Sequence, residues 1–354
     1  MSGVSVVICS FTMQRWNDLQ DAVRSVRRQT APPLEIVVVS DTNAELLARV
    51  RAEMPDVVAV PNRFGRGASG ARNSGVAAST GQFVAFLDDD AVAAEHWLER
   101  LIPTFADERW GPVLGAGGWL EPRWSGAEPR WFPAEFYWVV GGSYRGLPTQ
   151  RAEIRNVWAG NMAIRRDVFD AVGGFRQDFG KVGGRARPED TDLCLRTRVA
   201  FPGAVWMFEP AAVAEHKVPA GRATLRYYLQ RCYAEGVGKA ELVALSADDA
   251  MSDERRHALR ALPQGAARGL ADTVTGRDAA GIARSGAIIT GLAVAAAGRV
   301  AGAVAVRRAK SAERRAKSAE RRAHRGEPDT PSRPAPATLV PPEALENPDH
   351  ASAA

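Results

Sequence analysis

The sequence predicts an α/β fold built around one open sheet. Short apolar runs alternate with stretches of helical periodicity over residues 4–90, which is the order of elements in α/β domains. Polar residues follow the ends of these runs, since Ser10, Asp41 and Asp88 each stand directly after one. The carboxyl ends of parallel strands share one edge of such a sheet, where ligands bind, so we expect a cleft there.

The separate elements follow from composition and spacing. The apolar run at 4–9 lacks polar alternation and is typical of a strand buried on both faces. Residues 17–29 carry apolar side chains at helical spacing, and Pro32 and Pro33 end this helix. The expected order is strands at 4–9, 35–40, 57–60 and 83–87, with helices at 17–29 and 44–53 and a loop running into a helix at 67–79.

The acidic end of the run GQFVAFLDDD, residues 81–90, is the strongest single signal. Asp88, Asp89 and Asp90 repel one another and cannot be buried unpaired, so a strand end facing a cleft suits them. A solvated acidic turn is the alternative, and the buried strand before it favours the cleft. Converging Asp88 and Asp90 would offer hard oxygen ligands to Mg²⁺ or Mn²⁺, which can hold a diphosphate.

A literal G-x-G-x-x-G at Gly65, Gly67 and Gly70 raises the alternative of an NAD oxidoreductase. That fingerprint should directly follow the first strand, and the turn after Cys9 has no glycine. We expect these small residues instead to let the following helix pack closely on the sheet. Arg72 and Asn73 of that helix are expected to face the cleft.

The order of motifs resembles family 2 of the inverting glycosyltransferases, which have the GT-A fold. The resemblance covers residues 4–217 and rests on the segments VSVVICSF, VVVSD, NRFGRGASGARNSGVAASTGQFVAFLDDD and NVWAGNMAIRRDVFDAVGGFRQDFGKVGGRARPEDTDLCLR. It implies an open mixed sheet of GT-A type, followed by a helical C-terminal extension. It also implies a nucleotide-diphospho-sugar donor and a Mg²⁺ or Mn²⁺ cofactor.

The resemblance assigns roles to individual residues. It implies that Ser10 and Asp41 border the nucleotide base and that Asp90 binds the metal. The remaining donor contacts that it implies are Arg72 at the base or diphosphate, Asp88 near the ribose and the metal, Asp89, and Asn161 in the GNMAI strand.

Two further candidates lie later in the chain. Glu189 and Asp190 follow Pro188, a pattern that suits any helix N-terminus. The arrangement also matches the family's ED motif, which implies that Asp190 is the catalytic base, with Glu189 as the second choice. The resemblance further implies that His216 completes the metal site, and imidazole is a suitable ligand for Mn²⁺.

Residues 110–150 are rich in tryptophan, phenylalanine and tyrosine. Aromatic packing beneath a loop is one interpretation of this stretch. An acceptor platform is the other, because aromatic faces suit both sugars and membrane interfaces. The sequence leaves both open.

The charge distribution and the cysteines indicate the binding partners and the cellular compartment of the protein. The chain has 354 residues, is 45% hydrophobic and carries a net charge of +5 at pH 7, with much of the basic excess late in the chain. That distribution favours a basic tail near an anionic surface over a nucleic-acid binder. Cys9, Cys194 and Cys232 are scattered and lack metal spacing, and no secretory signal is expected, so we place the protein in the cytoplasm.

The C-terminal third is expected to differ from the rest. Residues 286–306 are rich in Ala, Val and Gly, but Arg299 makes the uninterrupted apolar part shorter than the roughly 20 residues of a span. A shallow interfacial helix is our first interpretation, then a packing helix, then a true span. The expected regions are a glycosyltransferase domain at 1–220, a helical and membrane-associated region at 221–306, a basic heptad-repeat helix at 307–327 and a disordered tail at 328–354.

These signals predict a metal-dependent inverting glycosyltransferase of envelope polysaccharide or glycolipid synthesis. Its expected partners are a nucleotide-sugar donor, a glycan or lipid-linked acceptor and the inner face of the cell membrane, with no nucleic acid. Direct transfer to polyprenyl phosphate is the alternative within the class. The alternative outside it is a non-catalytic membrane or nucleic-acid binding protein, which leaves the acidic motifs unexplained.

Overall fold

The structure is a computed structural model that describes residues 3–182, 185–245 and 257–324. Residues 1–306 form one compact unit, and residues 307–354 form a second. The first unit holds the sheet, its covering helices and most of the helical extension.

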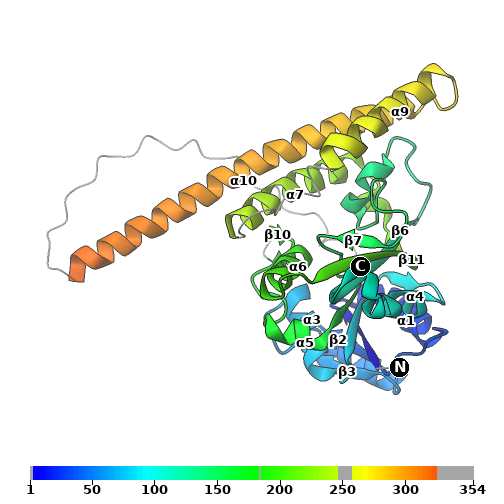
Figure 1. The fold of residues 1–354 in the computed structure, drawn as a ribbon, viewed down its shortest axis with the longest axis vertical. Helices are drawn as coiled ribbons and strands as arrows, with labels where there is room; N and C mark the ends of the chain where they lie inside the picture. Colours follow the sequence, from blue (N-terminus) through cyan, green and yellow to red (C-terminus); the bar gives the residue numbers. More distant parts are fainter. Residues whose placement is uncertain (1–2, 183–184, 246–256, 325–354) are drawn as a thin grey trace, which may run out of the picture. The chain divides into compact units, whose positions relative to one another are not determined.

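A nine-stranded mixed sheet organises the described part of the first unit (Figure 1). The strand order is β3-β2-β1-β4-β8-β6-β11-β5, with β7 paired to β11. The first four strands run parallel, β8 is antiparallel to both of its neighbours, and β6 and β11 are parallel to each other. The expected open mixed sheet is confirmed. The strands are β1 Val4–Ser10, β2 Glu35–Ser40, β3 Val58–Pro61, β4 Phe83–Asp88, β5 Ala91–Ala93, β6 Val113–Trp124, β7 Ala152–Ile154, β8 Asn161–Arg165 and β11 Val205–Val218.

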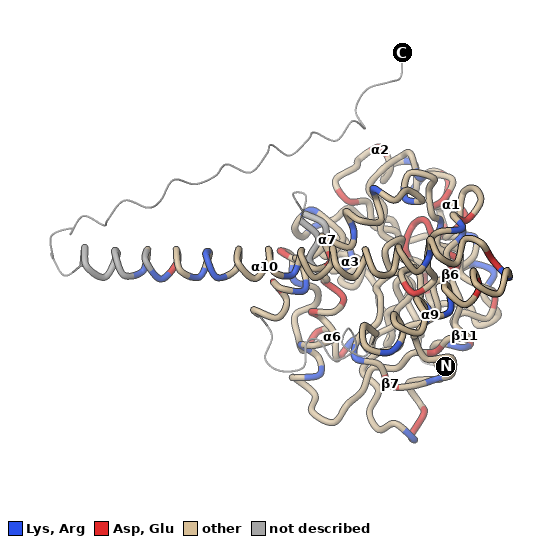
Figure 2. The backbone as a smooth tube through the Cα atoms, turned by 90° about the horizontal axis from the view of Figure 1, so that it is seen from above, with Lys and Arg blue, Asp and Glu red and all other residues tan. Residues whose placement is uncertain are grey.

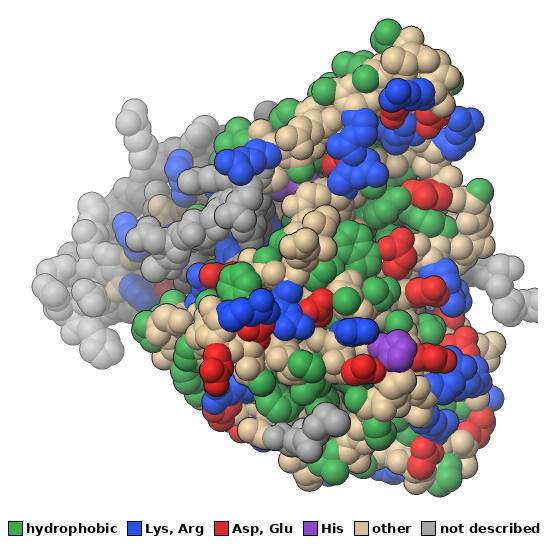
Figure 3. Space-filling model, turned by 45° about the vertical axis from the view of Figure 1, so that its right-hand side comes forward, with side chains coloured by type: hydrophobic (Ala, Val, Ile, Leu, Met, Phe, Trp, Pro, Cys, Tyr) green, Lys and Arg blue, Asp and Glu red, His purple; other side chains and the backbone are tan. Residues whose placement is uncertain are grey.

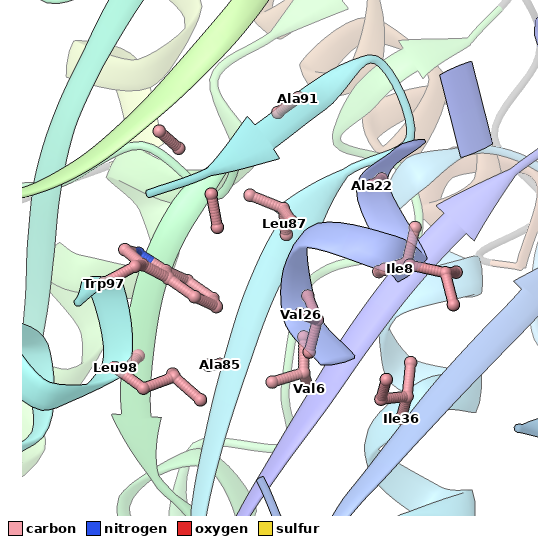
Figure 4. Close-up of a cluster of buried hydrophobic side chains, with 14 of the residues drawn as sticks. Val6, Ile8, Ala22, Val26, Ile36, Ala85, Leu87, Ala91, Trp97 and Leu98 are labelled. Carbon is pink, nitrogen blue, oxygen red and sulfur yellow. The ribbon is translucent and has the colours of Figure 1, made fainter. Parts of the chain in front are cut away.

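Helices cover both faces of the sheet. Along β1, Val6 and Ile8 belong to one apolar cluster and Val7 to another, as expected for a strand buried on both faces. Figure 4 shows the first cluster, where side chains of β1, β2 and β4 meet α1 and α4. The covering helices are α1 Trp16–Arg27, α2 Ala44–Glu53 and α4 Trp97–Leu101 on that face, and α3 Ala68–Ala78, α5 Arg166–Ala171 and α6 Glu189–Ala200 on the other.

Three segments form strands that the sequence predictions do not include. The aromatic stretch contains the long strand β6. A Cβ at Gly115, Gly117 or Gly118 would clash with neighbouring atoms, so these glycines allow β6 to pack closely on the residues around it. The glycine-rich segment before Pro188 contains two paired strands, β9 Gly180–Val182 and β10 Arg185–Arg187. His216 lies inside β11, because that strand continues past a register shift to Val218.

The helical extension contributes a third apolar cluster to the first unit. It comprises α7 Leu225–Leu245, the π-helical turn η6 His257–Ala261, α9 Leu262–Val274 and the start of α10 Gly281–His324. Tyr228 of α7 is fully buried here among Phe132, Phe136 and Ile288. Much of the aromatic stretch, including the 3-10 helix η4 Ala134–Val140, therefore packs as a core between the sheet and these helices.

The described part of the second unit is the remainder of α10. The RRAKSAE repeat lies in this helix, and Figure 2 shows Lys and Arg positions recurring along its backbone. The expected basic helix is helical to His324. The predicted disordered tail lies outside the described residues.

Candidate functional site

A cavity of about 1640 Å³ opens at the carboxyl ends of the parallel strands. Small-molecule sites usually measure roughly 300–1,000 Å³, so this one has room for two ligands. Nine of the ten predicted site residues line it: Ser10, Asp41, Arg72, Asp88, Asp89, Asp90, Glu189, Asp190 and His216.

Asp88, Asp90 and His216 form a cluster suited to a metal ion. One ligand atom from each lies within 4.8 Å of the others. Asp88 ends β4, Asp90 lies in the following turn, and His216 is opposite Ala91 in the β5–β11 pair, so the sheet itself brings them together. The Nε2 atom of His216 is 3.3 Å from Oδ1 of Asp90.

The surroundings of His216 also fit a divalent cation. Its ring is buried against Gly141, where a Cβ would come within 2.9 Å of Cε1, and the φ of +86° there favours glycine. Its Nδ1 atom has no hydrogen-bond partner in the described part of the chain. Two carboxylates and one imidazole are a donor set that suits Mn²⁺ or Mg²⁺.

Arg15 pairs with this acidic turn, and sequence reasoning missed it. Its Nη1 lies 2.9 Å from Asp89 and 3.0 Å from Asp90. The hydroxyl of Ser10 donates to Asp89 at 2.6 Å. Burial raises the pKa of Asp89 to about 6, although Arg15 and Ser10 oppose the shift. Ser10 and Asp89 thus brace the turn that carries Asp90.

Two hydrogen-bond donors hold the carboxylate of Asp41, which follows β2. The amide of Asn62 donates to one oxygen at 2.7 Å, and the backbone N–H of Gly67 donates to the other at 2.8 Å. Gly67 has a φ of +113°, a conformation that glycine tolerates and that starts α3. The glycines of the loop therefore fix Asp41 and the helix that carries Arg72.

Arg72 connects the metal cluster to the acidic pair on α6. Its guanidinium donates to Glu189 at 2.9 Å and lies 3.2 Å from Asp88. Burial alone would lower the pKa of Arg72, but the charges of Glu189 and Asp88 outweigh it and raise it. Glu189 is consequently occupied as the partner of Arg72.

Asp190 is the carboxylate left available for proton transfer. It accepts a hydrogen bond from the backbone N–H of Thr191 at 2.7 Å. Burial, and then the neighbouring charge of Glu189, raises its pKa to about 6, although Lys239 and Arg72 act in the opposite direction. A half-buried carboxyl with such a pKa is suited to general-base chemistry near neutral pH.

Two predicted cleft residues lie elsewhere. Asn161, the tenth predicted site residue, is buried outside the cavity, where its amide binds Trp97 Nε1 at 2.7 Å and the carbonyls of Trp119 and Ala212. The side chain of Asn73 does not face the cleft. Its Nδ2 donates to the carbonyl of Phe175, and its Oδ1 accepts from the backbone N–H of the same residue. Their polar atoms are used within the fold, which no local sequence pattern indicates.

The remaining cavity wall comes from the aromatic stretch, from the segment before β8 and from the helical extension. Trp138, Tyr144, Trp158 and Tyr227 provide aromatic surface there. Basic residues line the same part of the cavity: Arg222, Arg231, Lys239, Arg260 and Arg299. This wall combines aromatic rings with positive charge.

Comparisons with known sequences agree with this geometry. A family model described as "Glycosyl transferase family 2" matches residues 5–173. The chain is 32% identical over 240 residues to a glucosyl-dolichyl phosphate glucuronosyltransferase of Haloferax volcanii. The aligned region covers 67% of this chain and 76% of that protein. It is 30% identical over 275 residues to the succinoglycan biosynthesis protein ExoM of Rhizobium meliloti, spanning 73% and 77%.

Among solved structures, the fold is similar to that of a Pyrobaculum calidifontis mannosyltransferase, PcManGT, determined with GDP-Man and Mn²⁺. The TM-score is 0.52 at 17% identity, over 84% of this chain and 87% of that one. This likeness covers the fold alone.

Proposed function

Because the chain belongs to glycosyltransferase family 2, we propose that it moves a sugar from a nucleotide-diphospho-sugar to an acceptor hydroxyl, with inversion at the anomeric carbon. One observation carries the proposal. A single cavity holds a carboxylate–imidazole cluster on one side and Asp190, with its raised pKa, on the other.

The donor half would bind the nucleotide and its diphosphate. Asp41 and Ser10 lie at the strand ends where the base would enter, and Arg72 lies between the metal cluster and Glu189. Mn²⁺ or Mg²⁺ held by Asp88, Asp90 and His216 would neutralise charge on the departing diphosphate. Asn161 is left out of this site, because its amide is already fully used.

The chemical step would be a single displacement. The acceptor oxygen bonds to the anomeric carbon while the bond from that carbon to the diphosphate breaks, and Asp190 takes the hydroxyl proton. The hydrogen bond from Arg72 orients Glu189 beside Asp190. The negative charge of Glu189 in turn raises the affinity of Asp190 for that proton.

The features of the site argue against the alternatives. A phosphate monoester is already ionised near pH 7, so direct transfer to polyprenyl phosphate would leave Asp190 without a task. The G-x-G-x-x-G glycines follow β3 and lead into the first turn of α3, and β3 is the wrong strand for a dinucleotide fingerprint. A non-catalytic binding protein does not fit a chain of this family.

We also place the acceptor at a membrane. Within α10, residues 281–314 are long and apolar enough to cross a membrane by length and composition. One side of this helix packs on the first unit through Ala287 and Ile288, so full insertion would break those contacts, and shallow attachment suits the helix better. The glucuronosyltransferase relative, whose name gives it a dolichyl phosphate-linked substrate, supports a lipid-linked acceptor.

The outer side of the helical extension has the composition that such attachment needs. Figure 3 shows hydrophobic side chains along the upper edge of this region, with Lys and Arg beside them. Exposed apolar residues on α9 and α10 include Leu270, Val274, Ile282, Ile289, Val300 and Val304. Apolar insertion and basic charge together are the two signals for stable peripheral binding, which we assign to the cytoplasmic face of the cell membrane.

A thermal-shift panel of nucleotide sugars, each with and without Mn²⁺, tests the donor half. We expect one nucleotide to raise the melting temperature and Mn²⁺ to increase that rise. Proton NMR of the product formed with that donor would then give the anomeric configuration. A retained configuration, or equal protection with and without metal, would contradict the proposal.

A further inference from the structure

The end of the cavity farthest from the parallel strands is built where α7 and α10 cross. A Cβ on Gly236 of α7 would lie 2.0 Å from the carbonyl oxygen of Ala295 and 2.7 Å from the backbone nitrogen of Arg299. The two backbones are therefore in direct contact. Arg231 and Glu235 of α7 line the cavity beside Leu292 and Arg299 of α10.

The positive charges at this crossing differ in whether a carboxylate of the described residues lies beside them. Lys239 lies 3.5 Å from Glu235, which leaves that carboxylate engaged. Arg231 and Arg299 are half-buried, and neither is within salt-bridge distance of a carboxylate in the residues that the structure describes. Arg260 of η6, also without such a partner there, lines the same cavity. Guanidinium groups gathered in this way are suited to an anion with several acceptor oxygens.

An apolar surface leads outward from these arginines. Leu292 lines the cavity and is also 41% exposed, so the cavity wall continues onto the outer side of α10. Ile289 and Val300 lie on that outer side and are more than half exposed. A ligand with a charged group in the cavity and a hydrocarbon chain outside it would match the basic cavity wall and the apolar outer side of α10.

We infer that Arg231 and Arg299 bind the phosphate that links the acceptor sugar to its lipid, an inference that rests on the proposed function. The aromatic side chains of Trp138 and Tyr227 line the cavity with these arginines and Asp190, where they would contact the acceptor sugar. The reacting hydroxyl then lies at Asp190 and the phosphate at the α7–α10 crossing. In this arrangement Asp190 accepts the proton of the hydroxyl, and the two arginines bind the phosphate that links the sugar to the lipid.

The test measures the binding of farnesyl phosphate to the full chain in the presence of EDTA, with tryptophan fluorescence as the readout. EDTA removes metal ions, so the metal cluster cannot capture the phosphate. Trp138 and Trp158 line the cavity and report on occupancy. Farnesol, which lacks the charge, and inorganic phosphate, which lacks the lipid, are the comparison ligands.

We expect Arg231→Gln and Arg299→Gln each to weaken farnesyl phosphate binding by about tenfold, the usual worth of one charged hydrogen bond. Arg226→Gln is the matched control, since Arg226 lies on the same helix, is exposed and does not line the cavity. Melting temperatures of all three variants should match that of the wild type. The Asp90→Asn variant should bind farnesyl phosphate normally.

The results separate this inference from the proposed function. Farnesol binding as tightly as farnesyl phosphate, or both arginine variants binding like the wild type, would overturn the phosphate site. Inorganic phosphate competing as well as farnesyl phosphate would overturn the lipid linkage. In either case, Mn²⁺-dependent protection by a nucleotide sugar would leave the proposed function standing.

Discussion

The two sides of the cavity differ in how their charges are held. On the donor side Asp88, Asp89 and Asp90 each have an arginine within 3.2 Å, either Arg15 or Arg72. On the helical side Arg231, Arg260 and Arg299 have no carboxylate partner in the residues that the structure describes. A paired network keeps its geometry before a ligand arrives, whereas unpaired charges are neutralised by the ligand. The comparison indicates a preformed donor site facing an acceptor wall that an anion completes.

The largest expected effect is at the preformed side. Asp90→Asn should lower transfer by about 1,000-fold, because a metal contributes several kcal/mol of charge stabilisation. The Mn²⁺-dependent rise in melting temperature with the donor should disappear with it. His216→Ala should show a smaller loss of both. Full Mn²⁺-dependent donor binding by Asp90→Asn would remove this carboxylate from the site.

The pH dependence of transfer should be the next largest effect. Asp190 must be ionised to accept a proton, and its pKa is raised to about 6, so the rate should fall about tenfold per pH unit below that value. Asp89 also has a pKa near 6. Glu189→Gln separates the two, because losing the Glu189 charge should move the midpoint to lower pH only if Asp190 is responsible. An unmoved midpoint would point to Asp89.

A stability effect without a binding effect is expected at Asn161. Asn161→Ala would leave the indole N–H of Trp97 and two backbone carbonyls without their partner, at a cost of about 3 kcal/mol of unfolding free energy. Chemical denaturation measures this loss, with the exposed Asn17→Ala as control. Donor affinity should be unchanged, and a selective loss of donor affinity would restore the predicted donor contact.

The smallest effect on transfer is expected from removing residues 307–354, which form a separate unit. Each Lys or Arg near an anionic leaflet contributes about 1 kcal/mol, and salt screens that contribution. The truncated chain should therefore bind anionic vesicles more weakly in flotation assays, while neutral vesicles show little change. Nucleotide-sugar protection should persist. Equal vesicle binding by the two chains would limit the membrane contact to the first unit.

The donor side could largely be predicted because its signals are local. Buried strands that end in acids place Ser10, Asp41 and Asp88 at one edge, and the structure brings them to one cavity. Arg15 was missed, since its role depends on the segment after β1 bringing it to Asp89, which is distant in the chain. Asn161 was misplaced because burial in a central strand, and not its residue type, decides what its amide contacts.

The helical side could not be predicted in the same way. Its wall combines residues from the aromatic stretch, α7, η6 and α10 that are far apart in the chain. The crossing depends on close approach at Gly236 and Gly298, where a side chain would meet the partner backbone. In the sequence these glycines look like weak points of a helix. Only the packing shows that they bring Arg231 and Arg299 to one cavity.

The central claim is that Asp190 acts on the acceptor while the metal cluster holds the donor. Donor affinity and transfer rate should be measured together in Asp190→Asn, using the nucleotide sugar selected by the thermal-shift panel. We predict near-normal, Mn²⁺-dependent donor binding with transfer reduced by about 100-fold or more. Transfer within a few-fold of the wild type, with Glu189→Gln inactive instead, would contradict the assignment of the base.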